Sequence, residues 1–253
     1  MKKTLKAGVL LATGLFAMTG CSSSGDDAGT SPTQETTASA APSGTSEPSA
    51  AADASASAVG AEQYTAEQIE AALAGAKESQ GLGGQIIPGD MLRSQVEGAA
   101  GMLGDVVITP EKCDVLASMD VSKALDSANV GMMQLSATDL VSVVSRSEAA
   151  AAQYEAATTE QLMGECSEFQ MDVAGQVITA STQPLDAATD AESTHAFRTT
   201  VNAAGQATDS IQVAGVYGTT TITVSMTNAA DAGAAVDRAE ALINVLLGEL
   251  AEQ

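Results

Sequence analysis

The residues of this chain with the widest chemical scope are its three cysteines, Cys21, Cys113 and Cys166. A thiol can attack a substrate, ligate a metal, carry a lipid or pair with a second thiol in a disulfide. None of the three lies in a C-x-x-C motif, and the chain has a single histidine, His195, as a possible base. Lipid attachment and disulfide formation are therefore the favoured uses of these cysteines.

Cys21 follows a leader typical of an exported protein. Lys2, Lys3 and Lys6 supply positive charge, and an apolar stretch of about eleven residues follows at 7–17. A stretch of this length is typical of a signal peptide and is too short to cross a bilayer. The leader therefore predicts export of the remaining chain.

The residues next to Cys21 resemble a bacterial lipoprotein signal. Met18 takes the apolar position three residues before the cysteine, and Thr19 and Gly20 take the positions of small residues. The resemblance implies cleavage between Gly20 and Cys21, a diacylglyceryl group on the Cys21 sulfur, and a place on the outer face of the cell membrane. An ordinary secretory signal followed by an unrelated cysteine is the alternative.

Composition divides the chain into three parts: a signal peptide at 1–20, a tether at 21–61 and a single domain at 62–253. The tether consists almost entirely of Ser, Thr, Ala, Gly, Pro, Asp and Glu, so it lacks the apolar side chains needed to offset the entropy of ordering and is expected to be disordered. A flexible chain of forty residues spans about 35 Å on average. The domain is long enough to bury a core of its own.

The charge of the chain limits its partners. The net charge is −22, and about −25 without the three leader lysines. Such a surface repels nucleic acid and anionic lipid headgroups, so the lipid on Cys21 would be the only contact with the membrane. The remaining partner is expected to be an unidentified ligand or protein of the cell envelope.

With Cys21 assigned to lipid, Cys113 and Cys166 form a pair in an oxidising compartment. A disulfide between them is predicted to stabilise the domain by roughly 3–4 kcal/mol. It would hold the segment after Thr109 against the segment that enters a strand at Phe169. Two independent thiols, one of them nucleophilic, are the alternative.

Helices are predicted at both ends of the domain. Thr65 and Gln68 form a capping box ahead of a first helix, and Asp90 can cap a second. Thr109 followed by Pro110 predicts a third, which would carry Cys113. The spacing of apolar residues from Val236 to Leu250 predicts a closing helix that packs on a sheet, with a coiled coil as the alternative. A further helix is predicted over residues 148–165.

Strand patterns occupy the middle of the domain and predict an α+β fold with an antiparallel sheet of about five to seven strands, one face of which is solvated. The N-terminal helices and the C-terminal helix would pack on it. The runs that carry these patterns are 130–136, 140–145, 169–173, 177–182, 196–202, 210–217 and 219–228.

Three further groups of residues invite a chemical interpretation, and each has a simpler structural one. His195 shares strand parity with Phe197 and fits the rim of a core better than a general base. The carboxylates of one loop could attract a cation but lack the pattern of a calcium loop. Five methionines could serve as Cu(I) ligands, but Met132 and Met133 must point to opposite faces of a strand, and Met commonly fills gaps in a core. The loop carboxylates are Asp186, Asp190 and Glu192; the methionines are Met132, Met133, Met163, Met171 and Met226.

Motifs of known catalytic and nucleotide-binding sites are absent from the sequence. It contains no G-x-S-x-G, S-x-x-K, P-loop or H-E-x-x-H pattern, and no G-x-G-x-x-G that opens a helix. We therefore expect no catalytic residues, no metal site and no cofactor, and the chain is expected not to be an enzyme.

The order of elements resembles the PknH-like extracellular sensor domain, found in actinobacterial lipoproteins and on some receptor serine/threonine kinases. The resemblance is carried by Ile86, Ile87 and Pro88, by the run from Val106 to Cys113, and by the terminal helix at 236–250. It implies a non-catalytic, sensor-like or ligand-binding module, although the kinase-borne members carry two disulfides where this domain can form only one. No functional residues carry over. An accessory subunit of another envelope protein and a lipid carrier are the alternatives.

Overall fold

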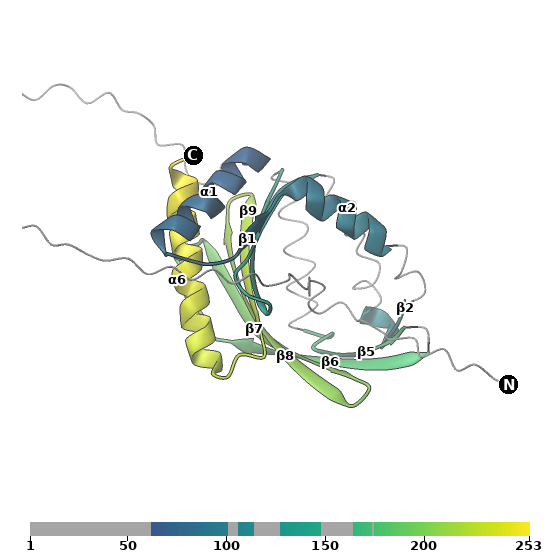
Figure 1. Cartoon of the computed structure of the whole chain (residues 1–253). Coiled ribbons are helices and arrows are strands. Elements are labelled where there is room, and N and C mark those ends of the chain that lie inside the picture. Colours follow the sequence, from purple (N-terminus) through teal and green to yellow (C-terminus); the bar gives the residue numbers. More distant parts are fainter. Residues whose placement is uncertain (1–61, 101–105, 114–126, 148–163, 174) are drawn as a thin grey trace, which may run out of the picture.

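The computed structural model describes residues 62–100, 106–113, 127–147, 164–173 and 175–253. The predicted signal peptide and tether, with Cys21, lie outside these residues, as do Met163 and nearly all of the helix predicted at 148–165. Within them the chain is an α+β structure with one antiparallel sheet of nine strands (Figure 1). The predicted fold class is therefore confirmed.

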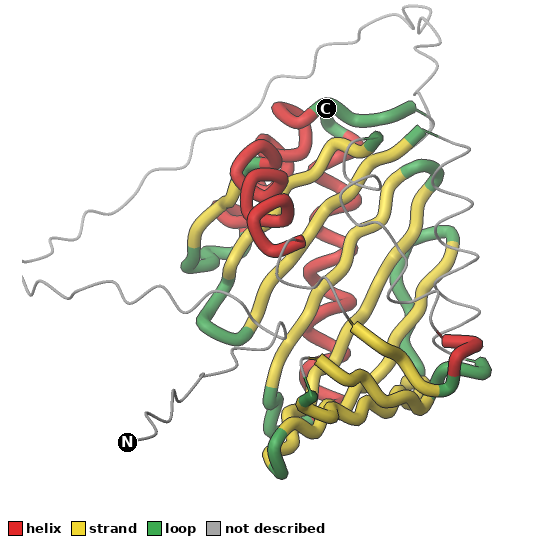
Figure 2. Tube along the Cα trace, turned by 90° about the vertical axis from the view of Figure 1, so that its right-hand side faces the viewer, coloured by secondary structure: helices red, strands yellow, loops and turns green. Residues whose placement is uncertain are grey.

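The strands are arranged in the order β1-β3-β4-β9-β8-β7-β6-β5-β2. Five of them, from β5 to β9, form a meander, and Figure 2 shows the strands side by side with the long helix α6 behind them. The strands are β1 (Gln85–Ile87), β2 (Val106–Thr109), β3 (Ala128–Gln134), β4 (Asp139–Arg146), β5 (Glu168–Val173), β6 (Gln176–Leu185), β7 (Ser193–Ala203), β8 (Gln206–Tyr217) and β9 (Thr220–Thr227). The helices are α1 (Ala66–Ser79), α2 (Gly89–Ala100), the 3-10 turn η1 (Glu111–Cys113) and α6 (Ala232–Ala251).

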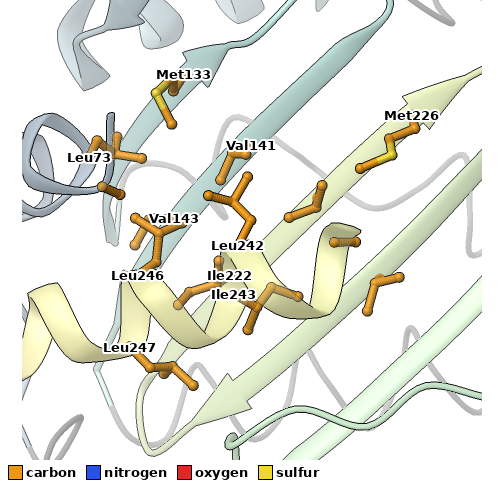
Figure 3. Packing of buried hydrophobic residues seen from close by; sticks show 14 of the residues in the cluster. Leu73, Met133, Val141, Val143, Ile222, Met226, Leu242, Ile243, Leu246 and Leu247 are labelled. Carbon is orange, nitrogen blue, oxygen red and sulfur yellow. The ribbon is translucent and has the colours of Figure 1, made fainter. Parts of the chain in front are cut away.

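The main core lies between one face of the sheet, here called the first face, and the helices α1 and α6. Val141, Val143, Ile222 and Val224 are fully buried on this face, because alternate residues of β4 and β9 point to the same side. Figure 3 shows Leu246 of α6 among these side chains. The apolar stripe of α6 therefore packs on the sheet, as predicted, and is not a coiled-coil seam.

The second face of the sheet carries two smaller clusters at its two ends. At one end Leu92 of α2 packs on Ile87, Ala128 and Val130. At the other end Ile108 packs with the two cysteines, Phe169 and Met171. Among the residues that the structure describes, the apolar side chains are therefore divided between the two faces, and the larger cluster lies on the first face.

A capping box and a glycine position α1. Thr65 and Gln68 exchange backbone and side-chain hydrogen bonds as predicted. Gly131 of β3 lies directly beneath the helix, where a Cβ atom would lie 2.6 Å from Cγ2 of Ile69. The missing side chain at Gly131 allows α1 to approach the sheet closely.

Two details of the predicted fold were wrong. The sheet has nine strands rather than five to seven, because the short edge strands β1 and β2 were not predicted. Thr109 does not cap a helix: it is the last residue of β2 and pairs with Gln170 of β5. Cys113 accordingly lies in the short turn η1. Cross-strand pairing of the β-branched run 106–108 prevails over the local cap-and-proline signal at Thr109.

Candidate functional site

The predicted disulfide is confirmed: Cys113 and Cys166 are bonded, with their Cα atoms 5.6 Å apart. Both cysteines are buried beside Ile108. The bond joins η1, which follows β2, to the segment that leads into β5. The two segments that it joins are those that the sequence predicted, and the structure places them at one edge of the sheet.

The single histidine belongs to a strand of the sheet, and the acidic loop is held by a helix. His195 lies on β7 with the parity of Phe197, on the second face of the sheet, and is partly buried. The loop between β6 and β7 is held by α6, since Glu240 accepts a hydrogen bond from the Ala188 N–H at 2.7 Å and Asn244 accepts one from the Asp190 N–H at 2.8 Å. The polar side of α6 thus fastens this loop.

The methionines do not converge. Met133 and Met226 belong to the main core, Met132 packs against the cluster under α2, and Met171 packs against the disulfide. Met132 and Met133 lie on opposite faces of β3, as predicted. The four candidate methionines that the structure describes therefore belong to three separate clusters and do not form a common copper site.

A concave feature lies on the first face, on the strands that α1 and α6 leave uncovered. It is an open depression of about 570 Å³ on β2, β5, β6 and β7. We call it the polar groove and define it by seven residues with polar side chains. Phe169 and Ala180, which alternate with them along β5 and β6, also line it. The seven are Thr109, Glu168, Gln170, Thr179, Ser181, Thr200 and Asn202.

Strand register arranges these side chains in two rows. In the first row Glu168 pairs with Ser181, Ser181 with Thr200, and Thr200 with Asp209 of β8. The second row runs from Thr109 through Gln170 and Thr179 to Asn202. Directly paired residues have Cβ atoms about 4.5–5.5 Å apart, so each row is a continuous line of polar groups across the strands.

Most of the polar side chains of the groove are exposed or have no partner among the described residues. Glu168, Gln170, Thr179 and Asn202 are exposed. Among the described residues, no side chain of the groove except that of Thr200 is engaged in a hydrogen bond or ion pair. Exposed donors and acceptors in an open depression are available to a polar partner.

Thr200 is held by a charged network at the end of the first row. Its hydroxyl donates a hydrogen bond to Oδ1 of Asp209 at 2.5 Å, and Arg198 forms an ion pair with Oδ2 of the same carboxylate. The hydrogen bond and charge of Arg198, with help from Thr200, lower the pKa of Asp209 below its usual value. Asp209 is therefore ionised throughout the neutral and mildly acidic range.

Replacing Asp209 with Asn should reduce the acid sensitivity of the fold. Because the pKa of Asp209 is lower in the folded state, its contribution to stability is complete above about pH 4 and is lost as the pH falls through the folded pKa. The unfolding free energy of Asp209→Asn should therefore fall less steeply below pH 4 than that of the wild type, measured by denaturant titration at several pH values. Equal slopes for the two proteins would contradict the expectation.

Sequence reasoning did not identify the polar groove. Each contributing strand shows a signal, since Glu168, Gln170 and Asp172 alternate with apolar residues in β5, and Thr179 and Ser181 do so in β6. The register that places these residues in common rows depends on pairing between strands, and the sequence does not specify it.

Comparisons with known proteins give weak similarities only. The extracellular domain of PknH from Mycobacterium tuberculosis is 11% identical and covers 77% of this chain and 100% of that chain, with a TM-score of 0.42. An uncharacterized protein from Mycobacterium smegmatis, the Rv0999 ortholog, is 12% identical and covers 72% of this chain and 96% of that chain, with a TM-score of 0.39. The predicted resemblance to the PknH-like domain is therefore confirmed as a weak one, and nothing about function follows from similarity at this level.

No protein-family model matches the chain, and no curated protein matches it. Within the described ranges, every helix is too short or too polar to cross a bilayer.

Proposed function

We propose that this protein is a lipid-anchored, extracytoplasmic binding module that presents the polar groove to a hydroxyl-rich polymer of the cell envelope. The observation that carries the proposal is the groove itself, an open depression of about 570 Å³ lined by hydroxyl, amide and carboxylate groups. Of these side chains, only that of Thr200 forms a hydrogen bond or ion pair with another residue that the structure describes. Saccharide hydroxyls both donate and accept hydrogen bonds, so they match such a lining.

The chemistry of the groove favours binding over catalysis. Among the described residues that line it, Glu168 is the only ionisable one, and its partner across the strands is Ser181. General acid–base chemistry on a polymer usually requires two such groups at a defined separation. A non-catalytic role accounts for a lining that combines many neutral polar groups with a single acid.

The point where the chain enters the domain leaves the groove accessible. The side chain of Gln63 donates to the carbonyl of Ser145 in β4, and the carbonyl of Glu62 accepts from Thr219 beside β9. β4 and β5 are separated by five strand positions in the sheet, or about 24 Å. A tether that starts at a lipidated Cys21 would therefore reach the domain on the half of the sheet away from the groove.

The binding part of the proposal is tested with the full chain and soluble cell-wall polysaccharide, by measuring co-sedimentation and thermal stabilisation. The paired substitution Gln170→Ala with Thr179→Ala should reduce binding at least tenfold, because it removes two neighbouring hydrogen-bonding groups from an exposed surface. Gln183→Ala, at an exposed position of the same strand outside the groove, is the matched control. Absence of binding, or equal binding by all variants, would refute this function.

The anchoring part is tested separately by Cys21→Ala in intact cells. The wild-type protein should fractionate with membranes and the variant with the soluble exported material, since a diacylated sulfur supplies the only membrane affinity that we propose. Retention of the variant in the membrane fraction would exclude Cys21 as the anchor without bearing on the groove.

A further inference from the structure

We propose that the polar groove is specific for an amino sugar oligomer, with a primary ammonium group bound at Glu168 and a hydroxyl donor bound at Thr200. This inference rests on the proposed function and narrows it to one ligand class. Two positions of the first row carry it, because each of them presents an acceptor and neither presents a donor.

Glu168 provides the first acceptor. Its carboxylate is exposed in the groove and has no ion-pair partner among the described residues. The described residues that line the groove include no lysine or arginine, and the chain carries a net charge of −22. An ammonium group beside Glu168 and the Ser181 hydroxyl gains a charge-assisted hydrogen bond, whereas an anionic sugar is repelled there.

Thr200 provides the second acceptor, and residues outside the groove determine the direction in which its hydroxyl donates. Asp209 is held ionised by Arg198, so its carboxylate can only accept hydrogen bonds. The proton of the Thr200 hydroxyl is therefore directed to Oδ1 of Asp209 at 2.5 Å. The Thr200 oxygen then turns its lone pairs to the groove, where it binds a group that donates.

The spacing of the two acceptors fits an oligomer rather than a single sugar. β5 and β7 are two strand positions apart, which places the Cα atoms of Glu168 and Thr200 about 10 Å from one another. The neighbouring row offers Gln170, Thr179 and Asn202, whose amides and hydroxyl both donate and accept. A chain of two or three sugars that crosses the strands can contact both rows.

The experiment compares the trisaccharide of β-1,4-linked glucosamine with its fully N-acetylated form by titration calorimetry on the full chain. Acetylation removes the charge of the amine and keeps the sugar skeleton. We expect the amine form to bind at least tenfold more tightly. Glu168→Gln should remove most of this preference, and Glu78→Gln, which deletes the same charge at an exposed position of α1, should retain it.

The second acceptor is tested by Thr200→Val, which preserves shape and removes the hydroxyl. The affinity for both trisaccharides should fall about fivefold to tenfold, since the hydroxyl donor loses its acceptor in both. A parallel titration with trilysine separates an amino sugar from any cationic chain: the wild type should bind it at least tenfold more weakly than the glucosamine trisaccharide.

Each contrary outcome has a definite meaning. Equal binding of the two trisaccharides, an equal loss of preference in Glu78→Gln, equal binding of trilysine or unchanged affinity in Thr200→Val would overturn the inference. If neither trisaccharide binds but cell-wall polysaccharide does, the inference fails and the proposed function stands. If the polysaccharide also fails to bind, both are refuted.

Discussion

Removing the disulfide with Cys113→Ala and Cys166→Ala is expected to lower the free energy of unfolding by roughly 3–4 kcal/mol. The bond closes a loop between residues 53 positions apart, so breaking it restores a large conformational freedom to the unfolded chain. For a domain of this size the loss corresponds to a fall in Tm of roughly 6–16 °C. Differential scanning calorimetry of the oxidised protein and the double variant measures both quantities.

The same substitution should weaken binding at the polar groove. Thr109 borders the groove from β2, an edge strand that the sheet holds through four residue pairs with β5. Cys113 and Cys166 clamp the ends of these two strands together, so without the bond β2 is more easily lost from the sheet. Affinity for cell-wall polysaccharide should fall in the double variant at a temperature where it is still folded.

A further substitution removes the thiol of Cys21 from both proteins that are compared. Cys21→Ser is introduced in both proteins, so that only the pair under test differs between them. Reduction of the control protein by a thiol reagent should reproduce the loss of stability. A change below about 1 kcal/mol in the double variant would show that packing around Ile108 holds this edge without the bond.

Much of the fold could be predicted because local patterns and tertiary packing agree. The alternation of Ile222, Val224 and Met226 with polar residues correctly predicted β9, and the stripe of α6 correctly predicted its packing on the sheet. The disulfide followed from the number of cysteines and the predicted compartment. In each case the signal is contained in a short segment or in the composition.

The edge strands and the polar groove could not be predicted because they depend on distant partners. β1 has only three residues, flanked closely by Gly84 and Pro88, and it becomes a strand by pairing with β3. Glu168, Ser181 and Thr200 are separated by 13 and 19 residues in the sequence and become neighbours only through the register of β5, β6 and β7. A strand pattern shows which residues share a face, but not which residues of other strands lie beside them.

Leu246→Ala is expected to destabilise the domain by about 3 kcal/mol, within the range of 2–5 kcal/mol typical of buried leucines. Leu246 is fully buried on α6, where it faces the sheet among Val143 and Ile222 (Figure 3). The truncation removes apolar contacts with the centre of the main core and leaves a cavity that rigid strands cannot readily fill. Urea unfolding of the full chain, followed by circular dichroism, measures the change.

The main core and the groove lie on the same face of one sheet, so Leu246→Ala also tests whether stability and binding can be separated. α6 packs on β8 and β9, whereas the groove lies on β2, β5, β6 and β7. Under conditions where the variant is fully folded, its affinity for cell-wall polysaccharide should equal that of the wild type. Leu246→Met, which nearly conserves volume, should lose less than about 1.5 kcal/mol and serves as the matched control. Reduced binding by folded Leu246→Ala would instead show that docking of α6 shapes the groove through the sheet.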